Sequence, residues 1–240
     1  MSRFLFLLMF PALLAAGNPV LVELFTSEGC SSCPPADALL AKLDELQPVA
    51  GVTVIALEEH VDYWDHLGWR DPFSAADFTA RQQRYAESLH VESPYTPEMV
   101  IDGRSEFVGN DSERALHELA AAHTVKTPVH VSLKDNSAGR ISLAVNVDAP
   151  KASGTVWLAI AETGLASDVA RGENAGRNLK HSAVVRKLST IGTVKAGEPF
   201  SAEPVVKLAK PWKPENLRAV VFTADSTGKV LGAAEVSLRN

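Results

Sequence analysis

The spacing of apolar residues divides the first half of the chain into strands and helices. Short, continuously apolar runs at residues 20–25 and 52–57 are typical of buried strands. Apolar residues three and four positions apart predict helices at 35–46, 73–89 and 112–123. Strands and helices that alternate in this way indicate an α/β arrangement with a mixed sheet.

Turn residues mark where these elements begin and end. Pro34 and Pro35 suit the first turn of a helix, where a missing N–H removes no hydrogen bond. Ser74 and Asp77 have the spacing of a capping-box variant at the start of the second helix. Asp102-Gly103 between apolar residues 97–101 and 106–108 is a strong hairpin signal.

After residue 127 the pattern changes to short β-type runs that alternate apolar and polar positions. Turn residues at 135–137 and 226–228 separate some of them, and scattered prolines argue against long helices. We therefore predict an all-β sandwich at residues 125–240 after an α/β domain at residues 18–124. Its strands are expected at 128–134, 140–147, 155–162, 183–191, 205–208, 218–223 and 230–238.

The first 17 residues have the pattern of a signal peptide. Arg3 provides the positive charge, residues 4–14 the apolar segment and Ala15-Ala16-Gly17 a cleavage site. We therefore expect a periplasmic or secreted protein with no stable membrane span after cleavage. The net charge of −6, without a basic cluster, argues against a nucleic-acid partner.

The chain has two cysteines, Cys30 and Cys33, between an apolar run and a helical pattern. A Cys-x-x-Cys at a strand-to-helix junction suits thiol–disulfide exchange, because the helix N-terminus stabilises a thiolate. An oxidising compartment favours a disulfide between the two cysteines. The sequence leaves open whether that disulfide reacts or is structural.

Together with Cys30-Ser31-Ser32-Cys33, the segment Tyr95-Thr96-Pro97 and the following Asp102-Gly103 resemble the thioredoxin superfamily. The resemblance implies a thioredoxin-like α/β domain in which a cis Pro97, preceded by Thr96, faces the cysteines and positions an extended substrate. It further implies that Cys30 is the attacking and more exposed thiolate, and that Cys33 resolves the mixed disulfide.

Three motifs also resemble an exported thioredoxin-like family of unknown function. They are VELFTSEGCSSCPPAD at 22–37, HVDYWD at 60–65 and YTP at 95–97. The chain departs from thioredoxin where that protein carries a buried carboxylate, because Leu24 occupies the position. Glu23 alternates onto the opposite face of the strand and cannot simply replace it.

His60 is the candidate for the missing base. It follows the apolar strand at 52–57, and ligands bind at the carboxyl ends of strands in open α/β sheets. Histidine titrates near neutral pH, which suits proton transfer. The alternative is that residues 60–69 form a structural loop anchored by aromatic side chains.

We expect no cofactor and no metal, because the histidines at 60, 66, 90 and 117 lack metal-ligand spacing. The polar segment 171–181 is either an anion-binding loop or a structural loop hydrogen-bonded to the first domain. A peroxide-reducing enzyme using Thr26 and Arg104 is a further possibility, although the spacing of its motif does not match.

The predicted function is therefore thiol–disulfide exchange by Cys30 and Cys33, with help from Thr96, Pro97 and His60. Its partners would be a protein thiol or disulfide substrate and an electron-exchange partner, because the couple stores only two electrons. The alternative is a non-catalytic envelope binding or assembly protein that uses a thioredoxin-like scaffold with a structural disulfide.

Overall fold

The structure is a computed structural model that describes residues 17–122, 124–137 and 139–239. The signal peptide expected at residues 1–17 lies outside this part of the chain except for Gly17. No helix among the described residues is long and apolar enough to cross a membrane.

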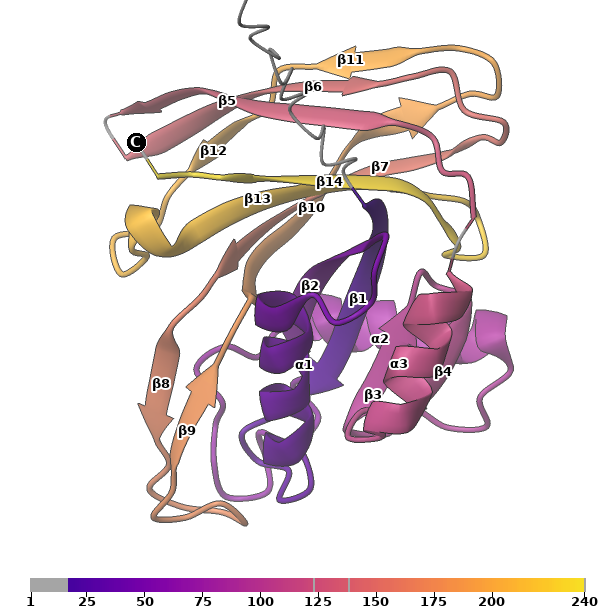
Figure 1. Cartoon of the computed structure of the whole chain (residues 1–240). Coiled ribbons are helices and arrows are strands. Elements are labelled where there is room, and N and C mark those ends of the chain that lie inside the picture. Colours follow the sequence, from indigo (N-terminus) through magenta and orange to yellow (C-terminus); the bar gives the residue numbers. More distant parts are fainter. Residues whose placement is uncertain (1–16, 123, 138, 240) are drawn as a thin grey trace, which may run out of the picture.

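The first half alternates strands and helices, close to the positions that the apolar spacing predicted (Figure 1). Its elements are β1 Asn18–Thr26, α1 Pro34–Leu46, β2 Val52–His60, α2 Ala76–Leu89, β3 Glu98–Ile101, β4 Ser105–Val108 and α3 Ser112–Ala121. The helix α2 begins later than expected because Ser74 does not cap it. The hydroxyl of Ser74 instead donates to Asp65 Oδ2 at 2.8 Å.

The second half is formed by strands and one short 3-10 turn, η1 Pro214–Asn216. The strands are β5 Val129–Ser137, β6 Arg140–Val147, β7 Gly154–Glu162, β8 Leu165–Asp168, β9 Asn178–His181, β10 Val184–Val194, β11 Phe200–Ala202, β12 Val205–Lys207, β13 Leu217–Ala224 and β14 Val230–Ser237. The sequence reading missed the three short strands β8, β9 and β11, which lie in polar segments.

One large mixed sheet runs through both halves of the chain. Its eight strands have the order β14-β13-β7-β10-β2-β1-β3-β4. The two halves meet where β10 pairs with β2 in parallel, with Val184 opposite Glu58. The predicted fold class, a thioredoxin-like α/β domain followed by a separate all-β sandwich, is therefore wrong, and no such α/β domain is evident. The boundary that we predicted near residue 125 stays a prediction.

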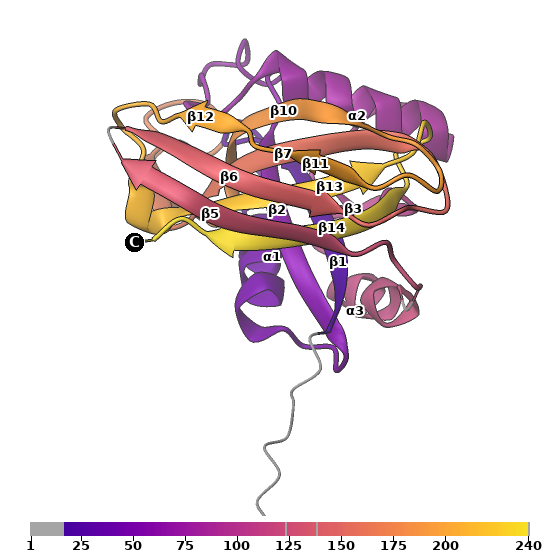
Figure 2. The same cartoon turned by 90° about the horizontal axis from the view of Figure 1, so that it is seen from above.

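The helices cover the two faces of the β1–β4 part of this sheet. The apolar faces of α1 and α3 pack on one side, against alternate residues of β1 and β2 such as Leu24 and Ala56. The helix α2 lies on the opposite side, where Tyr85 packs on Phe25 (Figure 2). Neighbouring residues of β1 and β2 consequently enter two different environments.

A second sheet covers the other end of the large one. It contains β11, β6 and β12, and β5 pairs with β6. Apolar residues of β5 and β6, including Ile141 and Val145, pack on residues of β7 and β13, including Leu158 and Val221. Figure 1 shows this sheet above β7, β13 and β14. The core beneath it is separate from the core around α1.

Two turns that are far apart in sequence touch where the halves meet. Asp102 and Gly103, both at positive φ, form the β3–β4 hairpin turn. A Cβ at Gly103 would lie 2.0 Å from the carbonyl oxygen of Gly228, in the β13–β14 turn. The contact therefore requires glycine at 103. The Val230 amide donates to the Asp102 carbonyl at 2.9 Å, which joins the two hairpins.

Candidate functional site

Cys30 and Cys33 form a disulfide between the end of β1 and the start of α1. The Cys33 carbonyl accepts the first helical hydrogen bonds, from the amides of Ala36 at 2.8 Å and Asp37 at 3.1 Å. We expected Cys30 to be the more exposed sulfur, but both cysteines are buried, at 1% and 0% exposure. Only Ser31 and Ser32 of the Cys-x-x-Cys segment are exposed.

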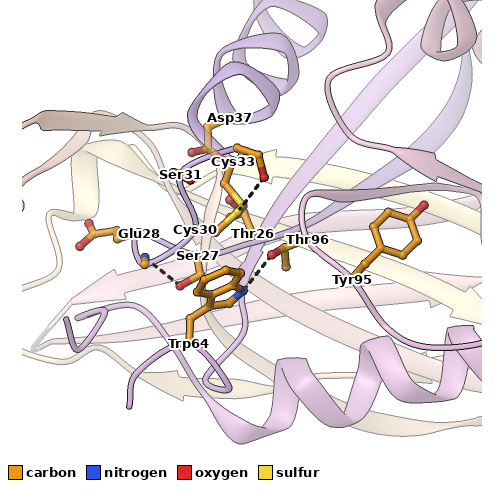
Figure 3. The surroundings of a disulfide bond; sticks show 12 residues. Thr26, Ser27, Glu28, Cys30, Ser31, Cys33, Asp37, Trp64, Tyr95 and Thr96 are labelled. Atoms are coloured by element: carbon orange, nitrogen blue, oxygen red, sulfur yellow. Dashed lines mark hydrogen bonds between the residues drawn. A yellow bond between two sulfur atoms is a disulfide. The ribbon is translucent and has the colours of Figure 1, made fainter. Parts of the chain in front are cut away.

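Trp64 and the segment before β3 flank the disulfide. The Trp64 indole N–H donates to Thr96 Oγ1 at 2.9 Å, and both side chains lie beside the sulfur atoms in Figure 3. The Thr96–Pro97 peptide bond is cis, as the resemblance implied. Gly109 lies close to both Pro97 and Ala36. A Cβ added at Gly109 would be 3.1 Å from the Cβ of Pro97 and 3.2 Å from the Cβ of Ala36. The predicted residues Thr96 and Pro97 are therefore next to the start of α1.

The strands β8 and β9 form an arm that extends along α1 and reaches the cysteine segment (Figure 1). The side-chain amide of Asn174, in the loop at the tip of this arm, donates to the carbonyls of Glu28 and Cys30, both at 2.9 Å. Glu173 accepts from the Ser31 amide at 3.1 Å. The polar segment 171–181 is thus hydrogen-bonded to the cysteine segment. This agrees with the second of the two predictions for it, a structural loop hydrogen-bonded to the first half of the chain.

A buried carboxyl group, Asp37, lies one helical turn after Cys33. Residues four apart in a helix share a face, so both side chains point into the protein from the same side of α1. The Thr26 hydroxyl donates to Asp37 Oδ1 at 2.6 Å. Burial, together with the nearby Glu58, raises the pKa of Asp37 to about 7. The site therefore contains a carboxyl group that can change its protonation near neutral pH.

A second buried group lies behind the cysteine segment, where two histidines alternate with three carboxylates. His60 Nδ1 is 2.7 Å from Asp71 Oδ2, and His60 Nε2 is 3.1 Å from Glu58 Oε1. His181 Nδ1 is 2.7 Å from the same Glu58 oxygen, and His181 Nε2 is 3.2 Å from Glu28 Oε1. We call these five residues the histidine–carboxylate cluster. Each has 4% or less of its surface exposed.

Mutual hydrogen bonds control the charges in this cluster. Burial raises the pKa of Glu58, but its hydrogen bonds with His181 and His60 outweigh burial and lower that pKa to about 2. Burial lowers the pKa of His181, whereas its contacts with Glu28 and Glu58 raise it to about 9. The pKa of His60 rises well above its usual value because the Asp71 contact outweighs burial.

Glu23 lies on the opposite face of β1, as strand alternation predicted. It accepts hydrogen bonds from Arg81 Nε and the Tyr85 hydroxyl of α2, both at 2.5 Å. Leu24 instead packs in the core around α1. Glu23 is therefore separated from the cysteines by the sheet itself.

The five predicted site residues lie in two separate parts of the structure. Cys30, Cys33, Thr96 and Pro97 lie together at the start of α1. His60 is the last residue of β2 and has both ring nitrogens bonded to carboxylates, so neither is free to accept a proton from sulfur. Its catalytic role stays a prediction.

Sequence reasoning missed Asp37 and Glu58, and it placed His181 only in the polar segment 171–181. Asp37 occupies a position between Ala36 and Leu40 on the apolar face of α1, and a carboxyl group on such a face signals a special role. Glu58 alternates with His60 near the end of a buried strand, which is a similar signal. The sequence could not show that His181 meets Glu58, because the two residues are 123 positions apart.

The fold and site define a mostly β protein, built on a large mixed sheet, with a buried Cys-x-x-Cys disulfide at a strand-to-helix junction. Residues 21–224 match the family model described as "Protein of unknown function (DUF1223)", and the chain belongs to this family. A search of curated proteins finds no match.

A solved structure resembles this chain over nearly its whole length. The crystal structure of protein AGR_C_4864 from Agrobacterium tumefaciens is 27% identical, with a TM-score of 0.73. The match covers 93% of this chain and 96% of that one. The sporulation control protein Spo0M from Bacillus subtilis is 12% identical over 47% of this chain and 48% of its own, with a TM-score of 0.34.

Proposed function

We propose that this protein is an exported thiol–disulfide oxidoreductase that acts on protein substrates through Cys30 and Cys33. The observation that carries the proposal is the disulfide at the first turn of α1, with Thr96 beside it and the buried Asp37 one turn further on. Unpaired amides at a helix N-terminus favour a thiolate over a thiol. A disulfide that closes so short a loop restricts the unfolded chain little, which argues against a purely structural role.

The exchange takes place in two balanced steps. In the reduced protein the Cys30 thiolate attacks a substrate disulfide, forming a mixed disulfide and releasing one substrate thiolate. The Cys33 thiolate then attacks the Cys30 sulfur, which regenerates the Cys30–Cys33 disulfide and releases the second substrate thiolate. Two electrons pass to the substrate, and an electron-exchange partner must restore them. Oxidation of a substrate dithiol follows the same steps in reverse.

In this proposal Asp37 accepts the proton that Cys33 loses. Cys33 must lose its proton before it can attack, and Asp37 lies on the same face of α1. A pKa of about 7 lets the carboxylate accept that proton at neutral pH and release it afterwards.

The burial of both sulfurs requires the substrate to reach Cys30 through a local opening. The exposed Ser31-Ser32 segment and the half-buried Thr96 border the disulfide, so a substrate chain would approach between them. Thr96 and Pro97 would position its backbone. Asn174 and Glu173 hold the cysteine segment from the arm, and release of these contacts would expose Cys30.

The first experimental test traps the mixed disulfide. Reduced Cys33→Ala protein is mixed with oxidised exported proteins, and the products are separated on non-reducing gels. We expect stable mixed disulfides that dithiothreitol dissolves, because Cys30 attacks and no thiol resolves the product. The matched Cys30→Ala variant, checked for equal thermal stability, should form far fewer. Equal yields from the two variants, or none from either, would contradict the proposal.

The burial of both cysteines favours one second candidate, an envelope binding or assembly protein with a structural disulfide. In that case neither variant traps a partner, and loss of the disulfide lowers stability without loss of binding. The trapping experiment therefore separates the two functions.

A further inference from the structure

The histidine–carboxylate cluster has the arrangement of a metal site. Glu58, His60 and His181 each offer one possible ligand atom, and these atoms lie within 4.8 Å of one another. They come from the end of β2 and the end of β9, which meet where β10 joins the large sheet. We propose that Glu58, His60 and His181 bind a divalent transition-metal ion, with Zn²⁺ as the ion of choice.

The ligand atoms lie close enough together for one ion to bind all three once the side chains move apart around it. Zinc binds imidazole nitrogen and carboxylate oxygen at about 2.0–2.2 Å, which places neighbouring ligand atoms about 3.3 Å apart. Glu58 Oε1 lies 3.1 Å from His60 Nε2 and 2.7 Å from His181 Nδ1. Two histidines and one glutamate are also a donor set that zinc enzymes use, with the fourth position left for water or substrate.

The outer nitrogens of the two rings provide an independent observation. His60 Nδ1 faces Asp71 and His181 Nε2 faces Glu28, so each ring has a carboxylate on the side away from Glu58. Metal-binding histidines typically make this contact, because it fixes the ring and increases its basicity. These carboxylates are themselves hydrogen-bonded. The Trp69 indole N–H donates to Glu28 Oε2 at 2.7 Å, and the Phe73 amide donates to Asp71 Oδ1 at 2.9 Å.

Burial gives a physical reason for a cation at this point. Three carboxylates and two histidines are enclosed together, and buried charged groups in proteins are usually paired or bound to metals. The Ser182 amide donates to the second oxygen of Glu58 at 2.9 Å, which leaves Oε1 directed at the two rings. A groove between α1 and β9 ends one residue before His181 in the sequence. It is lined by Pro34, Asp37, Ala38, Asn178, Leu179 and Lys180.

Zinc titration of the oxidised, EDTA-treated mature protein tests this inference. The disulfide is kept intact so that the cysteines cannot supply thiolates. By calorimetry we expect one Zn²⁺ per chain, with an affinity that His181→Ala lowers by at least about 100-fold. Glu28→Gln, which alters an outer partner only, should lower it by about 10- to 100-fold. His117→Ala, an exposed histidine on α3, is the matched control and should bind as the wild type does.

X-ray absorption of the zinc-loaded wild type gives a measurement that needs no variant. We expect two imidazole nitrogens and one or two oxygens at about 2.0–2.2 Å from zinc. Absence of stoichiometric binding, a spectrum without imidazole, or equal affinity in wild type and His181→Ala would overturn the site. A Cys30→Ser, Cys33→Ser double variant should retain zinc affinity, so failure of exchange and failure of zinc binding are distinguishable.

Discussion

Replacing Arg81 with methionine is expected to lower the free energy of unfolding by about 3–5 kcal/mol, the typical effect of breaking a buried ion pair. Arg81 is buried between Glu23, at 2.5 Å, and Glu59, at 3.6 Å. Its guanidinium group also lies over the rings of Trp157 and Phe222, which belong to the second half of the chain. Methionine retains much of the packing but leaves Glu23 buried without a counter-charge.

Two further variants show whether the charge is responsible. Arg84→Met changes an exposed arginine on the same helix and should alter stability by less than about 0.5 kcal/mol. Adding Glu23→Gln to Arg81→Met should recover part of the loss, because the uncompensated charge is removed. Chemical denaturation with the disulfide intact measures all three. Equal stability of Arg81→Met and Arg84→Met would contradict this account of the interior.

Replacing Asp37 with asparagine is expected to slow thiol–disulfide exchange by about 100-fold above pH 7, a typical contribution of a general base. In the wild type the pKa of Asp37, raised by burial and by Glu58, is about 7. The carboxyl group is protonated below that pH and cannot accept a proton there. The wild-type rate should therefore rise through pH 7, and the two rates should approach each other below pH 6.

The matched control for Asp37 is Glu45→Gln, which neutralises an exposed carboxylate on the same helix. Stopped-flow rates are measured from pH 5 to 9 in a chelating buffer, so that any metal bound near Glu58 does not alter the titration. Glu45→Gln should reproduce the wild-type profile. An Asp37→Asn profile that also coincides with the wild type would remove Asp37 from the proton transfer.

Strands, helices and turns could be predicted from the sequence where apolar spacing and turn residues determine them. The strand β6 was predicted at its observed bounds, and the Asp102-Gly103 turn lies where its two residues indicated. Such features depend on neighbours in the chain. The missed strands β8 and β9 are short and polar, and they pair only with each other. Alternating apolar residues that would mark an independent strand are absent from them.

The order of the strands in the sheet could not be predicted from the sequence, because apolar spacing does not specify which strands pair. The strand β10 joins β2 through a short parallel contact at Val184 and Glu58, which merges the two predicted domains into one sheet. The same contact brings His181 to His60. The histidine–carboxylate cluster could not be predicted, because its residues are far apart in the sequence. The two short motifs, in contrast, were enough to name the four residues around the disulfide, Cys30, Cys33, Thr96 and Pro97.

The reduction potential of the Cys30–Cys33 pair is the most direct test of the proposed exchange activity. The purified mature protein is equilibrated in thiol–disulfide buffers of graded potential, and the reduced fraction is measured by thiol alkylation. We predict a potential well above about −300 mV, in the range of exchangeable disulfides. A potential well below that value would mark a structural disulfide and contradict the proposed function.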